Sequence, residues 1–184
     1  MIFQFLIFGI FGKVINQDKD GNYRVEYNHN SNKIIWLALG DWGGKPKPFY
    51  TSRIQLSVAE SMKRTAKYYR PDYLLALGDN FYYSGVDDVT DPHWRLTFEN
   101  VYNSEELHCP WHPTTGNHDW DTHKVDGSGG NYTAQIEYSK LSNRWTFPDL
   151  FYTIDSTLAN GMKQRIIIID TPALTGTSYC SHIL

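Results

Sequence analysis

The alternation of apolar and polar blocks along the chain predicts an α/β protein. The run from Ile34 to Leu39 is continuously apolar, as in a strand that is buried on both faces. The loop GDWGGKPKP follows, and its glycines and prolines exclude regular structure. A helix is expected from Ser52, and a second buried strand from Tyr73 to Leu77. This order of strand, helix and strand predicts a βαβ unit with parallel strands.

The expected helix has clear start and stop signals. Ser52 and Gln55 form an S-x-x-Q capping box, and Pro71 ends the helix. Between them, apolar residues at helical spacing form one stripe: Ile54, Val58, Met62, Ala66 and Tyr69.

The remaining pattern adds shorter elements on both sides of this unit. Residues 14–32 predict a hairpin around the turn-rich segment QDKDGN, and residues 92–102 a short helix. A third strand is expected to end at TTGNHD, residues 114–119. A Gly-rich loop then precedes a helix at 132–142, and RIIIID at 165–170 reads as another buried strand.

Composition and charge narrow the function classes. The 184 residues are 41% hydrophobic and 15% aromatic, which suits one globular domain or part of a larger one. The net charge is −3 and Lys and Arg form no run, so the sequence does not support binding to nucleic acid.

The first twelve residues and the cysteines bear on the compartment. MIFQFLIFGIFG is too short to span a bilayer as a helix but has the length of a signal-peptide core; an ordinary buried segment is the alternative. Asn131 begins an N-x-T sequon, which is a candidate glycosylation site. Cys109 and Cys180 form no CxxC motif, and either one disulfide or two separate thiols fits the sequence.

Three segments end in glycine followed by a residue with a metal-binding oxygen. These pairs are Gly40-Asp41, Gly78-Asp79 and Gly116-Asn117. Ligands of open α/β sheets gather beyond the carboxyl ends of the strands, so parallel strands would bring these three oxygens to one edge. Each residue alone is more often a turn or capping residue, but three such ends together favour a site for hard or borderline metal ions.

Two further side chains belong to this candidate site. Tyr82 lies three residues after Asp79, and its phenolate would need a strongly Lewis-acidic ion such as Fe(III). His118 follows Asn117 and could contact a bound substrate. Taken alone, Tyr82 would be an ordinary core or rim aromatic residue.

At these residues the sequence resembles a known family. DWG at 41–43, GDNFY at 78–82 and GNHD at 116–119 are similar, in order, to the first three motifs of the binuclear metallophosphoesterases. The tyrosine of the second motif and the segment 130–152 resemble the purple acid phosphatases of the small tartrate-resistant type. The resemblance covers roughly residues 33–171.

The resemblance implies a dinuclear site with Fe(III) and a divalent ion, which is iron, zinc or manganese. Asp41 and Tyr82 would bind the Fe(III), Asp79 would bridge both ions, and Asn117 would bind the divalent ion. A hydroxide held between the ions would attack a phosphate monoester or phosphoprotein. His118 would hold the phosphate and protonate the leaving group.

The family fold would be a four-layer α/β/β/α sandwich, which is apparently truncated in this chain. The implied division is a signal peptide at 1–12, a hairpin-like extension at 13–32, the metallophosphoesterase domain at 33–171 and a divergent tail at 172–184. The protein is expected to be a secreted or lysosomal glycoprotein without a membrane span. The sequence leaves its oligomeric state open.

The chain departs from the family at its last two motifs. VxxH and GHxH, which supply three histidine ligands, are absent, and His182 in CSHIL matches neither. We therefore expect an acid phosphatase by family, with little or no activity in this chain alone.

Two other functions stay open. One is a non-catalytic secreted glycoprotein derived from the phosphatase fold. The other is a different metallophosphoesterase, such as a protein phosphatase or nuclease, which ranks last because those enzymes generally lack a tyrosine at the position of Tyr82.

Overall fold

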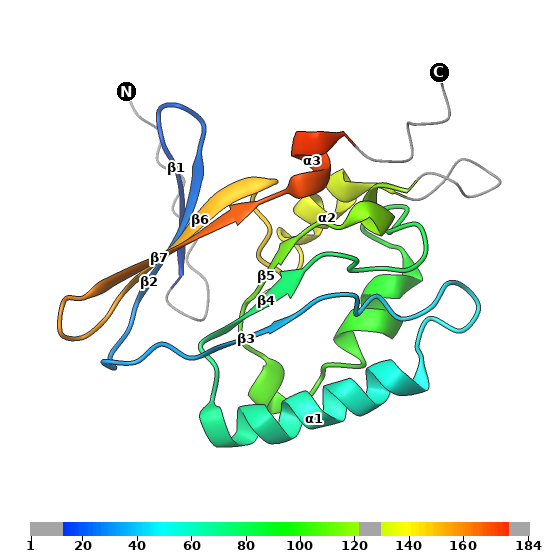
Figure 1. Cartoon of the computed structure of the whole chain (residues 1–184), viewed down its shortest axis with the longest axis horizontal. Coiled ribbons are helices and arrows are strands. Elements are labelled where there is room, and N and C mark those ends of the chain that lie inside the picture. Colours follow the sequence, from blue (N-terminus) through cyan, green and yellow to red (C-terminus); the bar gives the residue numbers. More distant parts are fainter. Residues whose placement is uncertain (1–12, 122–129, 177–184) are drawn as a thin grey trace. The chain divides into compact units, whose positions relative to one another are not determined.

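The computed structural model of the chain describes residues 13–121 and 130–176 (Figure 1). Contacts within the chain divide it into two compact units. Of the described residues, the first unit comprises 13–34 and 148–169, and the second comprises 35–121, 130–147 and 170–176. The domain predicted at 33–171 therefore contributes to both units, and the predicted signal peptide lies outside the described residues.

The first unit contains a four-stranded mixed sheet. Its strand order is β1 (Val14–Gln17), β2 (Tyr23–Asn28), β6 (Phe151–Thr157) and β7 (Lys163–Ile169). The antiparallel pair β1–β2 confirms the predicted hairpin. β2 pairs with β6 in parallel and β6 pairs with β7 antiparallel, so both sheet directions occur in this unit.

Strand β7 corrects one prediction. The run RIIIID was expected to be a buried strand, but β7 is an edge strand of its sheet. Ile168 is buried, whereas Ile167 is 63% exposed and Ile169 is 51% exposed. A continuous apolar run therefore marks the strand correctly here but does not fix the burial of both faces.

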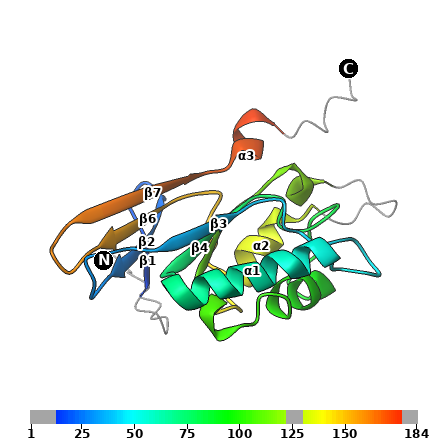
Figure 2. The same cartoon turned by 60° about the horizontal axis from the view of Figure 1, so that its bottom comes forward.

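The second unit contains the predicted βαβ arrangement. Strands β3 (Trp36–Leu39), β4 (Tyr73–Leu77) and β5 (Trp111–Thr114) form a three-stranded parallel sheet in that order. Helix α1 (Arg53–Tyr69) connects β3 to β4 and runs beside β3 (Figure 2). The Ser52 hydroxyl accepts a hydrogen bond from the Gln55 backbone amide at 3.0 Å, which confirms the predicted start of α1.

Burial of β3 differs from the prediction, and the apolar stripe of α1 is partly exposed. β3 is an edge strand, with Trp36 43% exposed, whereas β4 between its two neighbours is almost entirely buried. On α1, the buried side chains are Gln55, Ala59 and Ala66. Of the predicted apolar stripe only Ala66 is among them, and Ile54 is 78% exposed. The stripe is therefore only partly buried by the described residues: Ala66 lies in the core, whereas Val58 and Tyr69 are exposed as well.

Short helical segments complete the second unit. They are η1 (Trp94–Glu99), η2 (Glu105–Leu107), η3 (Asn117–Trp120), α2 (Tyr132–Tyr138) and α3 (Thr171–Thr175). The predicted helix at 92–102 thus contains the wide turns of η1, and the one predicted at 132–142 is the shorter α2.

An aromatic cluster forms the centre of this unit. Its rings lie within 6.2 Å of the Trp42 ring, which is 4% exposed. The cluster consists of Trp42, Phe81, Phe98, Tyr102, Trp111 and Trp145. Because Trp42 and Phe81 belong to the loops after β3 and β4, this core fixes both loops at the carboxyl edge of the sheet.

Candidate metal centre

The loops after β3 and β4 meet at the carboxyl edge of the parallel sheet. The Asp41 backbone amide donates a hydrogen bond to the Gly78 carbonyl at 3.2 Å. Asp41 and Asp79 have left-handed backbones, with φ of 54° and 50°, which is uncommon for residues other than glycine. Two aspartates in this strained region on adjacent loops are typical of a functional site.

Tyr82 joins both carboxylates. Its hydroxyl donates to Asp41 Oδ1 at 2.9 Å and to Asp79 Oδ2 at 3.1 Å. Burial, the hydrogen bond to Asp41 and the negative charge of Asp79 raise the pKa of the Tyr82 phenol well above its usual value. The Tyr82 hydroxyl thus lies within hydrogen-bond distance of both carboxylates.

His118 approaches the same cluster from the loop after β5. Its backbone amide donates to Asp79 Oδ1 at 3.2 Å, and its ring centroid lies 4.8 Å from that of Tyr82. The ring Nδ1 lies 2.6 Å from the Tyr83 carbonyl oxygen. Because a carbonyl only accepts hydrogen bonds, Nδ1 carries the hydrogen, and Nε2 is the nitrogen left for other partners.

Glycine is required where this third loop meets the second. A Cβ atom placed on Gly116 would overlap the side chain and the backbone of Asp79. Asn117 follows directly and begins η3. Within the described ranges, the hydrogen bonds of this cluster do not include the Asn117 amide, so the structure places Asn117 near the site without joining it to the other oxygens.

The oxygens of Asp41, Asp79 and Tyr82 fit a single hard cation. Ligands at 2.0–2.1 Å in octahedral geometry lie about 2.9 Å apart, and the two oxygen distances of this cluster are 2.9 and 3.1 Å. In the described part of the chain, no three His, Cys, Asp or Glu side chains gather as metal ligands. The candidate donor set therefore depends on the phenol of Tyr82.

A second layer of buried polar residues was not found from the sequence. Asp119 is fully buried and accepts hydrogen bonds from the backbone amides of Gly116 and Asn80, at 2.9 and 3.0 Å, and from the Gln135 side chain. Burial raises the pKa of the Asp119 carboxyl to about 7, although these hydrogen bonds oppose the rise. The sequence signal was its place in GNHD, directly after His118.

Asp170 was missed as well. It is fully buried, accepts hydrogen bonds from the Thr115 amide at 3.1 Å and from the Thr115 hydroxyl, and caps α3 through the Ala173 amide. Its carboxylate therefore holds the segment that leads from β5 to Gly116. The available signal was the single acid that ends the apolar run of β7.

The sequence of this region decides the family. Residues 36–172 match the family model described as calcineurin-like phosphoesterase. The chain belongs to the calcineurin-like phosphoesterase family. The matched residues include all three pairs of glycine and oxygen ligand: Gly40-Asp41, Gly78-Asp79 and Gly116-Asn117.

Curated members of this phosphoesterase family are similar to the chain over most of its length. Tartrate-resistant acid phosphatase type 5 of Homo sapiens is 40% identical over 148 residues, which is 79% of this chain and 43% of that protein. Purple acid phosphatase 4 of Arabidopsis thaliana is 36% identical over 150 residues, covering 80% of this chain and 39% of that protein. The chain thus spans less than half the length of these relatives.

A solved structure is also similar. It is described as GAP50, the anchor in the inner membrane complex of Plasmodium, and it aligns with a TM-score of 0.63 and 27% identity. The alignment covers 79% of this chain and 44% of that one. This neighbour and the family match support the α/β phosphoesterase fold, of which the described residues contain two mixed or parallel sheets rather than four complete layers.

The remaining predicted sites lie away from the metal cluster. Asn131 caps α2: its Oδ1 accepts from the Ala134 amide at 3.0 Å, and its Nδ2 donates to the Asp87 carbonyl at 2.9 Å. Cys109 is buried as a free thiol, and burial raises its pKa to about 12. Its proposed partner Cys180 lies outside the described residues. Within the described ranges, no helix is long and apolar enough to cross a membrane.

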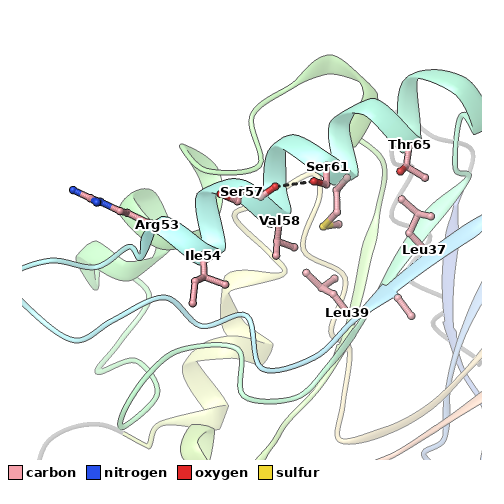
Figure 3. Close-up of a pocket in the computed structure, with 10 residues that line it drawn as sticks. Leu37, Leu39, Arg53, Ile54, Ser57, Val58, Ser61 and Thr65 are labelled. Carbon is pink, nitrogen blue, oxygen red and sulfur yellow. Dashed lines mark hydrogen bonds between the residues drawn. The ribbon is translucent and has the colours of Figure 1, made fainter.

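An apolar groove of about 550 Å³ lies between α1 and β3. Figure 3 shows Val58 of α1 facing Leu39 of β3 and Thr65 facing Leu37, with Ile54 at the other end of the groove. Three residues of the predicted apolar stripe thus line this groove: Ile54, Val58 and Met62.

Proposed function

We propose that this protein is an acid phosphatase that hydrolyses phosphate monoesters at a dinuclear Fe(III)–M(II) centre. The observation that carries the proposal is the convergence of the Asp41, Asp79 and Tyr82 oxygens at 2.9–3.1 Å. Its similarity to tartrate-resistant and purple acid phosphatases supports the substrate class.

Four residues of this chain would bind the two metal ions. Asp41 and Tyr82 would hold the Fe(III), Asp79 would face both ions, and Asn117 would hold the divalent ion. When bound, the two ions would lower the pKa of a water and offset the negative charge of the phosphate oxygens. The ligand oxygens lie on short loops that are fixed by hydrogen bonds, so they would not need to rearrange during the reaction.

His118 would supply the proton that the leaving alkoxide needs. Its Nδ1 hydrogen is engaged with the Tyr83 carbonyl, so the proton would come from Nε2 of the imidazolium form. The same contact fixes the ring in one orientation beside Tyr82. A phosphate held by His118 would therefore meet a donor that is already aligned.

The chain of 184 residues is proposed to bind metal but to turn over slowly by itself. Its candidate donors are oxygens of two carboxylates, one phenol and one amide, and the imidazole ligands of the family are not matched in its sequence. Fewer ligands leave each ion with an incomplete shell, which weakens its binding and leaves its position less well fixed.

We further propose that the protein is secreted or lysosomal and carries a glycan on Asn131. The N-glycosidic bond leaves one N–H on Nδ2, so the hydrogen bond to the Asp87 carbonyl can persist. The acceptor side of Asn131, which caps α2, is not altered by the modification.

The decisive experiment loads the purified chain with Fe(III) and measures bound iron together with the visible absorption spectrum. We expect bound iron and a phenolate-to-iron charge-transfer band. Tyr82→Phe should abolish the band, and Tyr132→Phe serves as the matched control because its ring stacks on Trp120, away from the cluster. A colourless wild-type chain, or a band that survives in Tyr82→Phe, would refute the metal assignment.

A non-catalytic protein is the second candidate function. Its specific support is the similar solved structure of GAP50, which is described as an anchor. A wild-type chain that binds no iron in the experiment above would favour this second function.

A further inference from the structure

Three fully buried polar side chains form a closed ring of hydrogen bonds, which we call the buried triangle: Asn80, Asp119 and Gln135. Gln135 Nε2 donates to Asp119 Oδ1 at 2.8 Å, and Gln135 Oε1 accepts from Asn80 Nδ2 at 3.1 Å. The Asn80 backbone amide closes the ring by donating to Asp119 Oδ2 at 3.0 Å.

The buried triangle reaches each loop that carries a candidate ligand. Trp42, which follows Asp41, donates from Nε1 to Asn80 Oδ1 at 3.0 Å. Asn80 itself follows Asp79, and Gly116, which precedes Asn117, donates its amide to Asp119 Oδ2 at 2.9 Å. The three loops are thus tied together one residue away from Asp41, Asp79 and Asn117.

Gln135 is the member of the triangle that comes from outside these loops. It projects from α2, and a glutamine offers a donor and an acceptor on one side chain, which Asp119 and Asn80 both need. Removing it would take from Asp119 Oδ1 its shortest hydrogen bond and from Asn80 Nδ2 one of its two acceptors. Asp119 Oδ1 would keep the Asn80 amide at 3.2 Å and Asn80 Nδ2 the Thr114 carbonyl at 2.9 Å, so two loops would each lose one of two buried contacts.

We infer that Gln135 is a positioning residue for the candidate metal centre. It acts through Asn80 and Asp119 to hold the loops after β4 and β5 at the separation that the ligand oxygens require. The inference rests on the proposed function, because it assigns Gln135 a role toward that same centre. Support from outside the ligand set is what keeps such oxygens in place before the metal binds.

The first test uses the metal-free protein and amide hydrogen exchange. In the wild type, the Asn80 and Gly116 amides should be protected although they lie in loops. Gln135→Met keeps the length of the side chain and removes its amide N–H and C=O groups. It should speed hydrogen exchange of the Asn80 and Gly116 amides about tenfold. Tyr138→Phe is the matched control on α2, since it removes only the hydrogen bond to Glu99 at 3.2 Å.

The second test measures Fe(III) affinity at a temperature where every variant is folded. Gln135→Met should weaken binding about tenfold or more and shift the charge-transfer band, whereas Tyr138→Phe should change neither. A role in stability alone would lower the unfolding temperature without moving the band.

The outcomes separate the two claims. Iron binding that Gln135→Met leaves at wild-type strength, in a folded variant, overturns the inference and leaves the proposed function standing. A wild-type protein that binds no iron overturns both. If Gln135→Met does not fold, the wild-type exchange decides: unprotected Asn80 and Gly116 amides would overturn the inference.

Discussion

The Tyr82 hydroxyl is the residue-scale feature on which the metal assignment depends. It donates to two carboxylates at once, and burial together with their charge raises its pKa. The raised pKa favours the protonated phenol in the metal-free protein. A cation that binds these oxygens must first displace that proton.

This proton can be counted. We expect Fe(III), supplied as its nitrilotriacetate complex, to release one more proton per ion from the wild type than from Tyr82→Phe. Calorimetry in buffers of different ionisation enthalpy measures the difference. Iron binding should accordingly strengthen as the pH rises in the wild type, and this dependence should be weaker in the variant. Equal proton release from both proteins would mean that Tyr82 is not a ligand.

At the scale of elements, the turn before η1 is held by one buried carboxylate. Asp91 accepts hydrogen bonds from the His93 ring at 2.8 Å, from the His93 amide at 2.9 Å and from the Asp87 amide at 2.8 Å. Burial alone would raise the pKa of Asp91, but the hydrogen bonds from His93 and Asp87 outweigh it, so the pKa lies below the usual value of 3.8.

The lowered pKa of Asp91 predicts how stability depends on pH. The ionised form is favoured by folding, so its contribution is present above about pH 4 and is lost as the pH falls through the lower folded-state pKa. Asp91→Asn should cost about 2 kcal/mol in unfolding free energy at pH 7, and less below pH 4. Urea unfolding from pH 2.5 to 7 measures this, with the exposed Asp20→Asn as control. A cost that does not change with pH would contradict the prediction.

The strands show what the sequence could and could not predict at this scale. The parallel pair β3–β4 and the start of α1 at Ser52 follow from local signals, namely apolar runs and a capping box, and all are confirmed. The burial predicted for β3 and β7 was wrong. An apolar run indicates that a strand face should be covered, but it does not show which part of a chain covers it.

The sequence likewise predicted some residues of the candidate site and not others. Asp41, Asp79 and Tyr82 could be selected because strand ends in parallel sheets converge, and the structure brings their oxygens together. Asp119 and Gln135 could not be selected, because a buried carboxylate or amide is recognised by its hydrogen-bond partners. Their shared partner Asn80 lies 39 residues from Asp119 and 55 residues from Gln135 in the sequence. Their roles become visible only in the tertiary structure.

At the scale of the whole molecule, the chain spans less than half the length of its curated relatives and exposes a continuous apolar surface. The groove between α1 and β3 is lined by Leu37, Leu39, Ile54, Val58 and Met62. β3 also has no strand paired on its outer edge among the described residues. Apolar surface next to an open sheet edge favours association with another apolar partner or with other copies of the chain.

This surface makes the last prediction. The purified chain of 184 residues should bind a hydrophobic fluorescent dye while folded, because the groove has an apolar lining and a volume of about 550 Å³. The double variant Ile54→Ser and Val58→Ser should remove most of that fluorescence and raise solubility. Its effect on unfolding free energy should be small, since Ile54 is 78% exposed and Val58 is 40% exposed.

Leu141→Ser is the matched control, because Leu141 is 67% exposed and does not line the groove. It should leave dye binding unchanged. If the double variant instead lowers stability by several kcal/mol while the wild type binds little dye, the groove is already covered in solution. Sedimentation would then show whether a second copy of the chain provides the cover. Either outcome decides whether the apolar stripe of α1 is a free surface or a buried face of a larger arrangement.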